Sequence, residues 1–262
     1  MNIKQGIRRN FARRAGSYDR YAGVQRLMGE RLLGMISPWV GGVESLLEVG
    51  CGTGFLTERL RQANAQARMV ALDLDPSLVS RARRRLGPDA RLHWVVADAE
   101  SWVRGAFDLI ISNAVFHWLT LPGLACRNFL DCLNPGGRLA FAALGPQTFQ
   151  ELDASLKRAG DRLDLTLPEI PARSFLERED WAALLARAGF AQVNLLAEEV
   201  RVEYPGVMDF LKALQATGAT NPRPRAFSPR LLRCLIGEYD AIFRHNGAVP
   251  VTYEIIWAVA EK

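Results

Sequence analysis

A short apolar segment followed by three closely spaced glycines constrains this chain more than any other feature. Residues 45–49 form the apolar segment, Gly50, Gly52 and Gly54 follow it, and residues 55–63 show a helical pattern. Glycines at such a place let a buried strand turn tightly into a helix and let a ligand approach the backbone amides. The sequence therefore predicts an α/β fold with a ligand-binding turn behind its first strand.

Strand and helix patterns alternate along the first 145 residues. Further apolar runs indicate strands, and segments with apolar residues at helical spacing indicate helices. The strands are expected at residues 69–72, 91–96, 107–112 and 137–144, the helices at 20–36, 77–86 and 122–133, and a turn at 134–137 (Asn-Pro-Gly-Gly). This alternation is typical of a parallel, doubly wound sheet.

The alternation becomes less regular after residue 144. Helices are expected at residues 147–159 and 180–188, the second ending at Gly189, and strands at 193–204 and 251–260 around a mostly helical insertion at 206–246. No linker is visible, so one domain over residues 1–262 is expected. Its parts are a helical lid at 1–40, a core at 41–145, and a C-terminal half at 146–262 with the helical cap.

Polar side chains stand at the ends of the first four expected strands. Glu48 directly precedes the glycines, Asp73 ends the second strand, Asp98 the third and Asn113 the fourth. Because the carboxyl ends of parallel strands meet at one edge of a sheet, these residues outline one crevice. Asp73 is placed to bind the two hydroxyls of a ribose, and Asp98 could accept a hydrogen bond from the exocyclic amine of adenine.

The glycine spacing disfavours a dinucleotide in this crevice. Bulky Phe55 stands where the dinucleotide fingerprint needs a third small residue. Glu48 would be a poor neighbour for a diphosphate, whereas it suits a ligand that carries an ammonium group. We therefore expect an adenosyl cofactor.

The charge and the cysteine content restrict the partners, metal sites and cellular compartment that can be expected for this protein. The net charge is +5, and residues 1–31 carry eight Lys and Arg against two acidic residues; a second basic run comprises Arg81 and residues 83–85. Such patches attract anionic partners. The four cysteines form no Cys-x-x-Cys pair and only three histidines are present, so no metal site is expected and a reducing cytoplasm fits. No apolar run reaches the roughly 20 residues of a membrane span, and no aromatics interleave with the basic runs as nucleic-acid binding would favour.

The region from residue 44 to 145 resembles the class I S-adenosylmethionine-dependent methyltransferases. Residues 46–54 are similar to their glycine motif, Asp73 to their ribose-binding acid, residues 97–99 (Ala-Asp-Ala) to their adenine motif, and 134–137 to the turn before their fifth strand. The resemblance implies a Rossmann-like, seven-stranded, mostly parallel sheet with an antiparallel last strand. It also implies that S-adenosylmethionine is bound by Glu48, Gly50, Cys51, Gly52, Gly54, Asp73, Leu74, Asp98, Ala99 and Asn113.

The flanking segments resemble the malonyl-acyl-carrier-protein O-methyltransferases of biotin synthesis. The matching segments are residues 11–15 with Tyr18, Ala22 and Gln25, Ser112-Asn113 with Trp118, residues 211–212 with 218–221, and residues 251–253. His117 departs from the pattern, because some members of that family carry Gln there. The resemblance implies methyl transfer to the free carboxylate of a malonyl group on a carrier protein.

Several acceptor-side roles follow as expectations. Tyr18 and Gln25 are expected to line a lid over the cofactor, and His117 and Trp118 to form walls of the acceptor pocket. An arginine fork suits the malonyl carboxylate in a mostly closed pocket. Arg201 is our choice, with Arg223 and Arg225 as alternatives.

Methylation of a carboxylate agrees with the absence of a recognisable catalytic base or triad in the sequence. A carboxylate is already ionised at pH 7 and needs no general base, and no Ser-His-Asp or Cys-His arrangement is present. Acyl carrier proteins are acidic, so the basic residues at 4–31 or Arg81 to Arg85 could dock a carrier protein that holds malonyl-phosphopantetheine. Malonyl-coenzyme A is the alternative substrate. We expect a monomer with no nucleic-acid or membrane partner.

Two other functions stay open from the sequence. One is a methyltransferase that acts on another small carboxylate, such as trans-aconitate. The other is a methyltransferase-fold assembly factor of respiratory complexes, for which the Arg-rich N-terminus would be a targeting segment.

Overall fold

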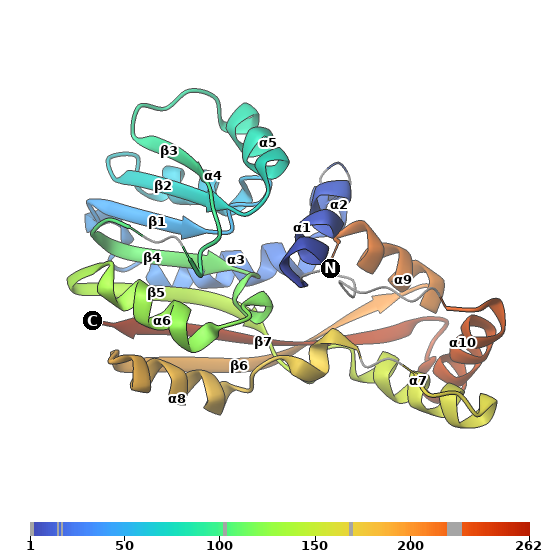
Figure 1. Cartoon of the computed structure of the whole chain (residues 1–262). Helices are drawn as coiled ribbons and strands as arrows, with labels where there is room; N and C mark the ends of the chain where they lie inside the picture. The colour runs from blue at the N-terminus through green and yellow to red at the C-terminus, as the bar shows by residue number, and fades with distance from the viewer. Residues whose placement is uncertain (1–2, 15, 17, 102–103, 168–169, 219–226) are drawn as a thin grey trace. The chain divides into compact units, whose positions relative to one another are not determined.

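The computed structural model describes residues 3–14, 16, 18–101, 104–167, 170–218 and 227–262 (Figure 1). The strands are β1 (Ser45–Val49), β2 (Arg68–Asp73), β3 (Leu92–Val96), β4 (Phe107–Asn113), β5 (Leu133–Leu144), β6 (Ala191–Tyr204) and β7 (Val249–Glu261). The α-helices are α1 (Ile3–Arg14), α2 (Tyr18–Tyr21), α3 (Gly23–Ile36), α4 (Phe55–Ala63), α5 (Pro76–Leu86), α6 (Pro122–Asp131), α7 (Gln150–Leu163), α8 (Arg178–Ala188), α9 (Val207–Ala216) and α10 (Pro229–Phe243). Short 3₁₀ helices lie at η1 (Val40–Gly42), η2 (Phe116–Trp118) and η3 (Pro171–Ser174).

The strands form one sheet of seven in the order β3-β2-β1-β4-β5-β7-β6. The pairs from β3 to β5 are parallel. β7 runs antiparallel to β5: Lys262 N donates to Gly137 O and Gly145 N donates to Glu254 O, each at 2.9 Å, so numbers fall along one strand as they rise along the other. The predicted seven-stranded, mostly parallel fold with an antiparallel last strand is confirmed.

The chain divides into two compact units. The core unit comprises Ala22–Ala143, Leu176–Ala197 and Ile256–Lys262, and the second unit comprises Met1–Tyr21, Leu144–Phe175 and Glu198–Ile255. β6 and β7 therefore contribute residues to both. The expectation of a single domain with a lid and a cap stays a prediction.

Aromatic side chains organise the core unit behind its strands. Phe116 stacks on Phe141 with ring centroids 4.3 Å apart, and Phe141 lies 5.0 Å from Trp181 of α8. All three side chains are buried, and such aromatic pairs add to the free energy from burial alone. Trp257 is also buried, and its Nε1 donates to Met28 O of α3 at 3.0 Å, which joins β7 to this helix.

The start of β5 corrects one sequence prediction. The strand begins at Leu133, not at residue 137, so the predicted Asn-Pro-Gly-Gly turn lies within it. The pairing with β4 is irregular there, because Phe107 faces Leu133 whereas Leu109 already faces Arg138. Gly136 has φ of 72°. The turn residues thus form a bulge in the pairing with β4, which a local turn signal does not distinguish from a free turn.

Side-chain pairs from distant positions in the sequence hold the second unit together. Glu238 of α10 accepts hydrogen bonds from Arg158 and Arg162 of α7, each at 3.0 Å. The Tyr239 hydroxyl donates to Pro250 O at 2.6 Å. The predicted helical insertion is confirmed as α9 and α10, while residues 219–226 between them lie outside the described residues. None of the helices in the described part of the chain is long and apolar enough to cross a membrane.

Candidate functional site

The three glycines behind β1 all adopt left-handed backbone conformations, with φ of 80° at Gly50, 53° at Gly52 and 87° at Gly54. A Cβ at Gly50 would collide with Val115 Cγ2, and one at Gly54 would lie 2.9 Å from Leu86 Cδ1. A Cβ at Gly52 would meet no atom within 4 Å. Gly50 and Gly54 are therefore required by close packing, whereas Gly52 faces open space that a ligand can fill.

Backbone amides tie the glycine loop to the end of β2. Gly50 N and Cys51 N both donate to Leu72 O, at 2.7 and 2.9 Å. Gly52 N donates to Asp73 Oδ2 at 2.9 Å. The loop is thus held in shape by the neighbouring strand before any ligand binds.

Asp73 shapes the loop and the following helix. Its Oδ1 accepts the amide of Asp75 at 2.9 Å, and Asp75 in turn caps α5 by accepting Ser77 N and Leu78 N. Burial raises the pKa of Asp73 to about 6, against the amides that stabilise its charge. The ribose-binding role expected for Asp73 stays a prediction, as does that of half-buried Leu74. The sequence analysis missed the cap, although Asp-Pro-Ser before an apolar helical pattern signals one.

Glu48 is a buried carboxyl beside the loop. It is 1% exposed, and its Oε2 accepts the Thr57 hydroxyl at 2.6 Å. Burial raises the pKa of Glu48 to about 8, and the nearby charge of Asp73 acts in the same direction. Burial and both carboxylates also raise the pKa of the Cys51 thiol far above its usual value, so this cysteine is inert. Two adjacent buried carboxyls favour a ligand that brings positive charge.

Asn113 at the end of β4 presents an unused acceptor. Its Nδ2 donates to Gln25 O of α3 at 2.8 Å, while its buried Oδ1 has no hydrogen-bond partner among the described residues. Gly29 permits the close approach of α3, since a Cβ there would lie 3.1 Å from Asn113 Nδ2. A buried oxygen without a donor is costly unless a ligand supplies one. This site therefore fits a ligand with a polar hydrogen, and Gln25 acts through its backbone.

The end of β3 is fixed by local turns. Asp98 Oδ1 accepts Glu100 N at 3.0 Å, and Ala99 between them is buried. The buried Glu100 side chain accepts the Thr120 hydroxyl at 2.8 Å and also the amide of Leu121. The role of Glu100 could not be predicted from the sequence, because its partners lie about 20 residues away and no motif marks them.

His117 and Trp118 lie together on η2, just beyond β4. Their ring centroids are 5.2 Å apart. Burial lowers the pKa of His117 to about 3, so the imidazole is neutral at pH 7. It can therefore form a wall or a neutral hydrogen bond, but it supplies no charge to pair with a carboxylate.

Two predicted acceptor residues belong to the second unit. Tyr18 begins α2 and is half-buried, and Arg201 lies on β6 and is exposed. The exposure of Arg201 differs from the closed pocket expected around it, and both roles stay predictions. Arg223 and Arg225 lie outside the described residues. Within the ranges that the structure describes, no group of three or more His, Cys, Asp or Glu side chains could hold a metal ion.

Comparisons with known proteins agree with this geometry. The family described as "Methyltransferase domain" matches residues 47–141. A phosphoethanolamine N-methyltransferase 2 of Haemonchus contortus shares the fold at a TM-score of 0.64 and 14% identity, over 100% of this chain and 61% of that one.

Relatives in sequence extend over nearly the whole chain. The malonyl-acyl-carrier-protein O-methyltransferase of Anoxybacillus flavithermus is 35% identical over 97% of this chain and 96% of its own length. The enzyme of the same name from Geobacter sulfurreducens is 33% identical over 99% of both. Because these relatives are at least 30% identical to this chain and are matched over nearly their whole length, this chain belongs to the malonyl-acyl-carrier-protein O-methyltransferase family.

Proposed function

We propose that this protein transfers a methyl group from S-adenosylmethionine to the free carboxylate of malonyl-acyl-carrier protein, an O-methylation that serves biotin synthesis. The observation that carries the proposal is the glycine loop, in which left-handed Gly52 faces open space. Buried Glu48 and the unpartnered Oδ1 of Asn113 add acceptors suited to a cationic ligand.

The residues of the crevice match the parts of S-adenosylmethionine. Glu48 and Asn113 can accept hydrogen bonds from its ammonium group, Asp73 from its ribose hydroxyls and Asp98 from its adenine amine. The loop amides behind β1 allow close approach of the backbone. When bound, S-adenosylmethionine supplies a methyl group made electrophilic by the positively charged sulfur.

The chain's own contribution to methyl transfer is positioning. The malonyl carboxylate is already ionised at pH 7, so no residue has to remove a proton. Neutral His117 agrees with a reaction that needs neither acid nor base. Alignment of reacting groups can contribute about 7–11 kcal/mol in favourable systems. We assign the acceptor side to Tyr18, Gln25, His117 and Trp118, with Arg201 binding the substrate carboxylate.

The same proposal includes the cellular setting. The reduced cysteines fit a cytoplasmic enzyme, and burial raises the pKa of Cys126 to about 12, so this thiol also stays protonated. We propose a monomer, and size-exclusion chromatography with light scattering tests that state directly.

Methyl transfer from labelled S-adenosylmethionine is the decisive experiment. Malonyl-acyl-carrier protein should become labelled, and the label should be released by alkali because it is an ester. Malonyl-coenzyme A and trans-aconitate serve as parallel acceptors. Label on trans-aconitate alone would overturn the substrate, and bound cofactor without any transfer would favour the assembly-factor function.

Replacement of Asn113 tests the cofactor site separately. Asn113→Leu should raise the Kd of S-adenosylmethionine about ten-fold or more, since it removes the free acceptor and leaves the cofactor's donor unpaired. Asn134→Leu is the matched control, because it also removes a half-buried amide. The Asn134 amide lies away from the crevice and donates a hydrogen bond of 2.6 Å to Asp108. Calorimetric titration should show weaker binding only for Asn113→Leu. Equal affinities in both variants would remove Asn113 from the cofactor site.

A further inference from the structure

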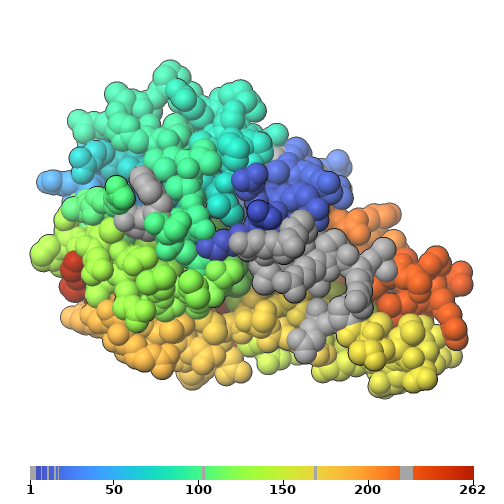
Figure 2. All heavy atoms as spheres, viewed as in Figure 1, coloured from blue at the N-terminus to red at the C-terminus, as the bar shows by residue number. Residues whose placement is uncertain are grey.

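The segment from α4 to β3 in the core unit carries a concentrated positive charge. Residues 55–91 contain eight arginines against four acidic residues. Two of those acids, Asp73 and Asp75, are buried at the glycine loop and the start of α5. Figure 2 shows the atoms of α5, coloured teal, at the molecular surface.

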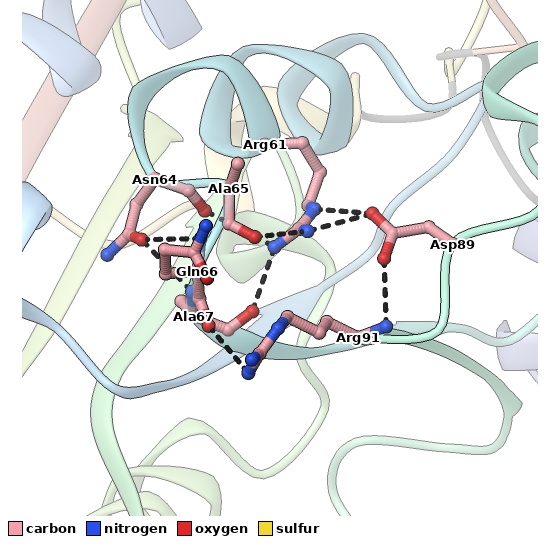
Figure 3. A network of polar contacts seen from close by, with 7 residues as sticks. All are labelled: Arg61, Asn64, Ala65, Gln66, Ala67, Asp89 and Arg91. Atoms are coloured by element: carbon pink, nitrogen blue, oxygen red, sulfur yellow. Dashed lines mark hydrogen bonds and ion pairs between the residues drawn. The ribbon is translucent and has the colours of Figure 1, made fainter.

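The two remaining acids are already paired. Glu58 of α4 forms an ion pair with Arg85 at 2.6 Å, and Asp89 forms one with Arg61 at 2.8 Å. Figure 3 shows that Arg61 also donates to backbone carbonyls of the turn after α4, those of Asn64, Ala65 and Ala67 at 2.7 to 3.2 Å. This network fixes the loop that follows α5 and leaves no acid there to neutralise further arginines.

Arg83 and Arg84 are two uncompensated charges on α5. Both are exposed, and neither has a carboxylate partner within the part of the chain that the structure describes. Arg84 Nη1 donates to the Ser80 hydroxyl at 2.7 Å. Because Leu78 and Ala82 form the buried face of the helix, these arginines project from a rigid, well-anchored surface. We call Arg83 and Arg84 the α5 patch.

The helix that carries the α5 patch packs on the glycine loop. A Cβ on Gly54 would lie 2.9 Å from Leu86 Cδ1 and 3.1 Å from Ala82 Cβ, so the last turns of α5 pack directly on the loop. A partner that contacts this turn is therefore held one helix away from the cofactor crevice.

Most basic side chains of the N-terminal segment already make contacts within the chain. Of its eight Lys and Arg residues, five have partners within the chain: Lys4, Arg8, Arg14, Arg26 and Arg31. Arg20 lies over the ring of Tyr21, and Arg9 Nε is buried. From the sequence, both basic regions are equally good candidates for a docking surface. The surroundings of their side chains in the structure favour the region on α5.

We propose that the α5 patch is the docking surface for the acidic carrier protein that presents the malonyl group. This inference rests on the proposed function. Exposed, unpaired arginines on a rigid helix attract an acidic protein without any rearrangement. Because their helix packs on the glycine loop, a carrier protein bound there is held close to the cofactor crevice.

Charge reversal tests the docking surface. The double variant Arg83→Glu with Arg84→Glu should raise KM for malonyl-acyl-carrier protein about ten-fold, because rim charges of the wrong sign oppose association. The KM for malonyl-coenzyme A and kcat should stay close to those of the wild type. Raising the ionic strength should weaken the difference, since salt screens exposed charges.

The matched control reverses two other exposed arginines of the core unit. Arg127 of α6 and Arg187 of α8 are exposed and have no ion pair among the described residues. Arg127→Glu with Arg187→Glu changes the net charge equally, and Arg187, like the α5 patch, lies in the last turn of its helix. This variant should keep the wild-type KM for the carrier-bound substrate. Melting temperature and S-adenosylmethionine affinity report whether each variant folds.

The outcomes separate this inference from the proposed function. If wild-type protein methylates malonyl-acyl-carrier protein and the α5 variant keeps its KM, the docking surface is overturned while the function stands. Equal increases in KM for the α5 and control variants would also overturn it, since net charge alone would then explain the effect. If the α5 variant instead loses binding to a double-stranded oligonucleotide with an unchanged KM, the patch serves nucleic acid. Absence of methyl transfer by the wild type would overturn the function itself.

Discussion

The glycine loop and the helical part of the second unit are built by different means. In the loop, backbone conformation dominates: three left-handed glycines, two amides on Leu72 O and one amide on Asp73 lie within about 25 residues of sequence. In the second unit, side chains far apart in sequence do the joining. Glu151 accepts the amide and the hydroxyl of Thr252, 101 residues away.

This difference explains why the cofactor site is easier to predict from the sequence than the acceptor site. A tight turn around a ligand restricts residue types through backbone sterics, so it leaves a recognisable pattern. A pair such as Glu151 and Thr252 leaves none, because either side chain is common in many surroundings. Substitutions in the two regions should therefore fail in different ways.

The largest effect is expected for Gly50→Ala. The left-handed backbone costs a residue with a Cβ roughly 1–2 kcal/mol, and the collision with Val115 adds about 1–3 kcal/mol. Urea unfolding should show the loss of stability, and calorimetry should show loss of S-adenosylmethionine binding. Wild-type cofactor affinity in this variant would mean that the loop does not shape the site.

Next in size is the pH dependence that Glu48 confers. Its pKa rises on folding from an ordinary carboxyl value to about 8, so the folded protein binds this proton more tightly than the unfolded chain. Its contribution to stability is complete below about pH 4.5 and is lost as the pH rises through 8, by on the order of 3 kcal/mol. Asp73, with a pKa raised to about 6, acts in the same direction over a narrower range.

Glu48→Gln should remove most of this slope from the cofactor-free protein. Unfolding in urea at a series of pH values compares the variant with the wild type. The expectation fails if both proteins lose the same stability between pH 5 and about 8.

A smaller effect is expected for Glu151→Gln in the second unit. A neutral amide has only one acceptor oxygen for the two donors of Thr252, so one buried donor loses its partner, at about 1–3 kcal/mol. Thermal unfolding should show lower stability, while the Kd of S-adenosylmethionine should stay that of the wild type. A weaker cofactor Kd would show that the two regions are not as independent as their construction suggests.

The smallest effect is expected for Gly237→Ala on α10. This glycine is exposed and lies in a helix interior, and the Cβ of an alanine at this position would meet no atom within 4 Å. Alanine should stabilise the helix by up to about 1 kcal/mol. The same substitution as at Gly50 thus has the opposite sign, and thermal melts of the two variants measure that contrast.

Most of the fold could be predicted, because its elements depend on local patterns. The helix at 55–63 and the strand at 45–49 have the predicted bounds, and α8 ends at the left-handed Gly189 as expected. The start of β5 could not be predicted, since a bulge and a turn use the same residues. The helix cap at Asp75 could have been predicted from the Asp-Pro-Ser sequence but was not.

Of the candidate site, the glycine loop and the acidic strand ends could be predicted, while their partners could not. The sequence by itself determined the doubly wound fold, the place of the crevice and the family, because strand ends, glycines and periodicity act over a few residues. Only the tertiary structure decided that Asn113 joins Gln25 over 88 residues and keeps a free oxygen. It also decided that Arg61 and Arg85 take the acids beside α5, leaving Arg83 and Arg84 unpaired. Such outcomes depend on which side chains meet across distant elements, and that is a property of packing.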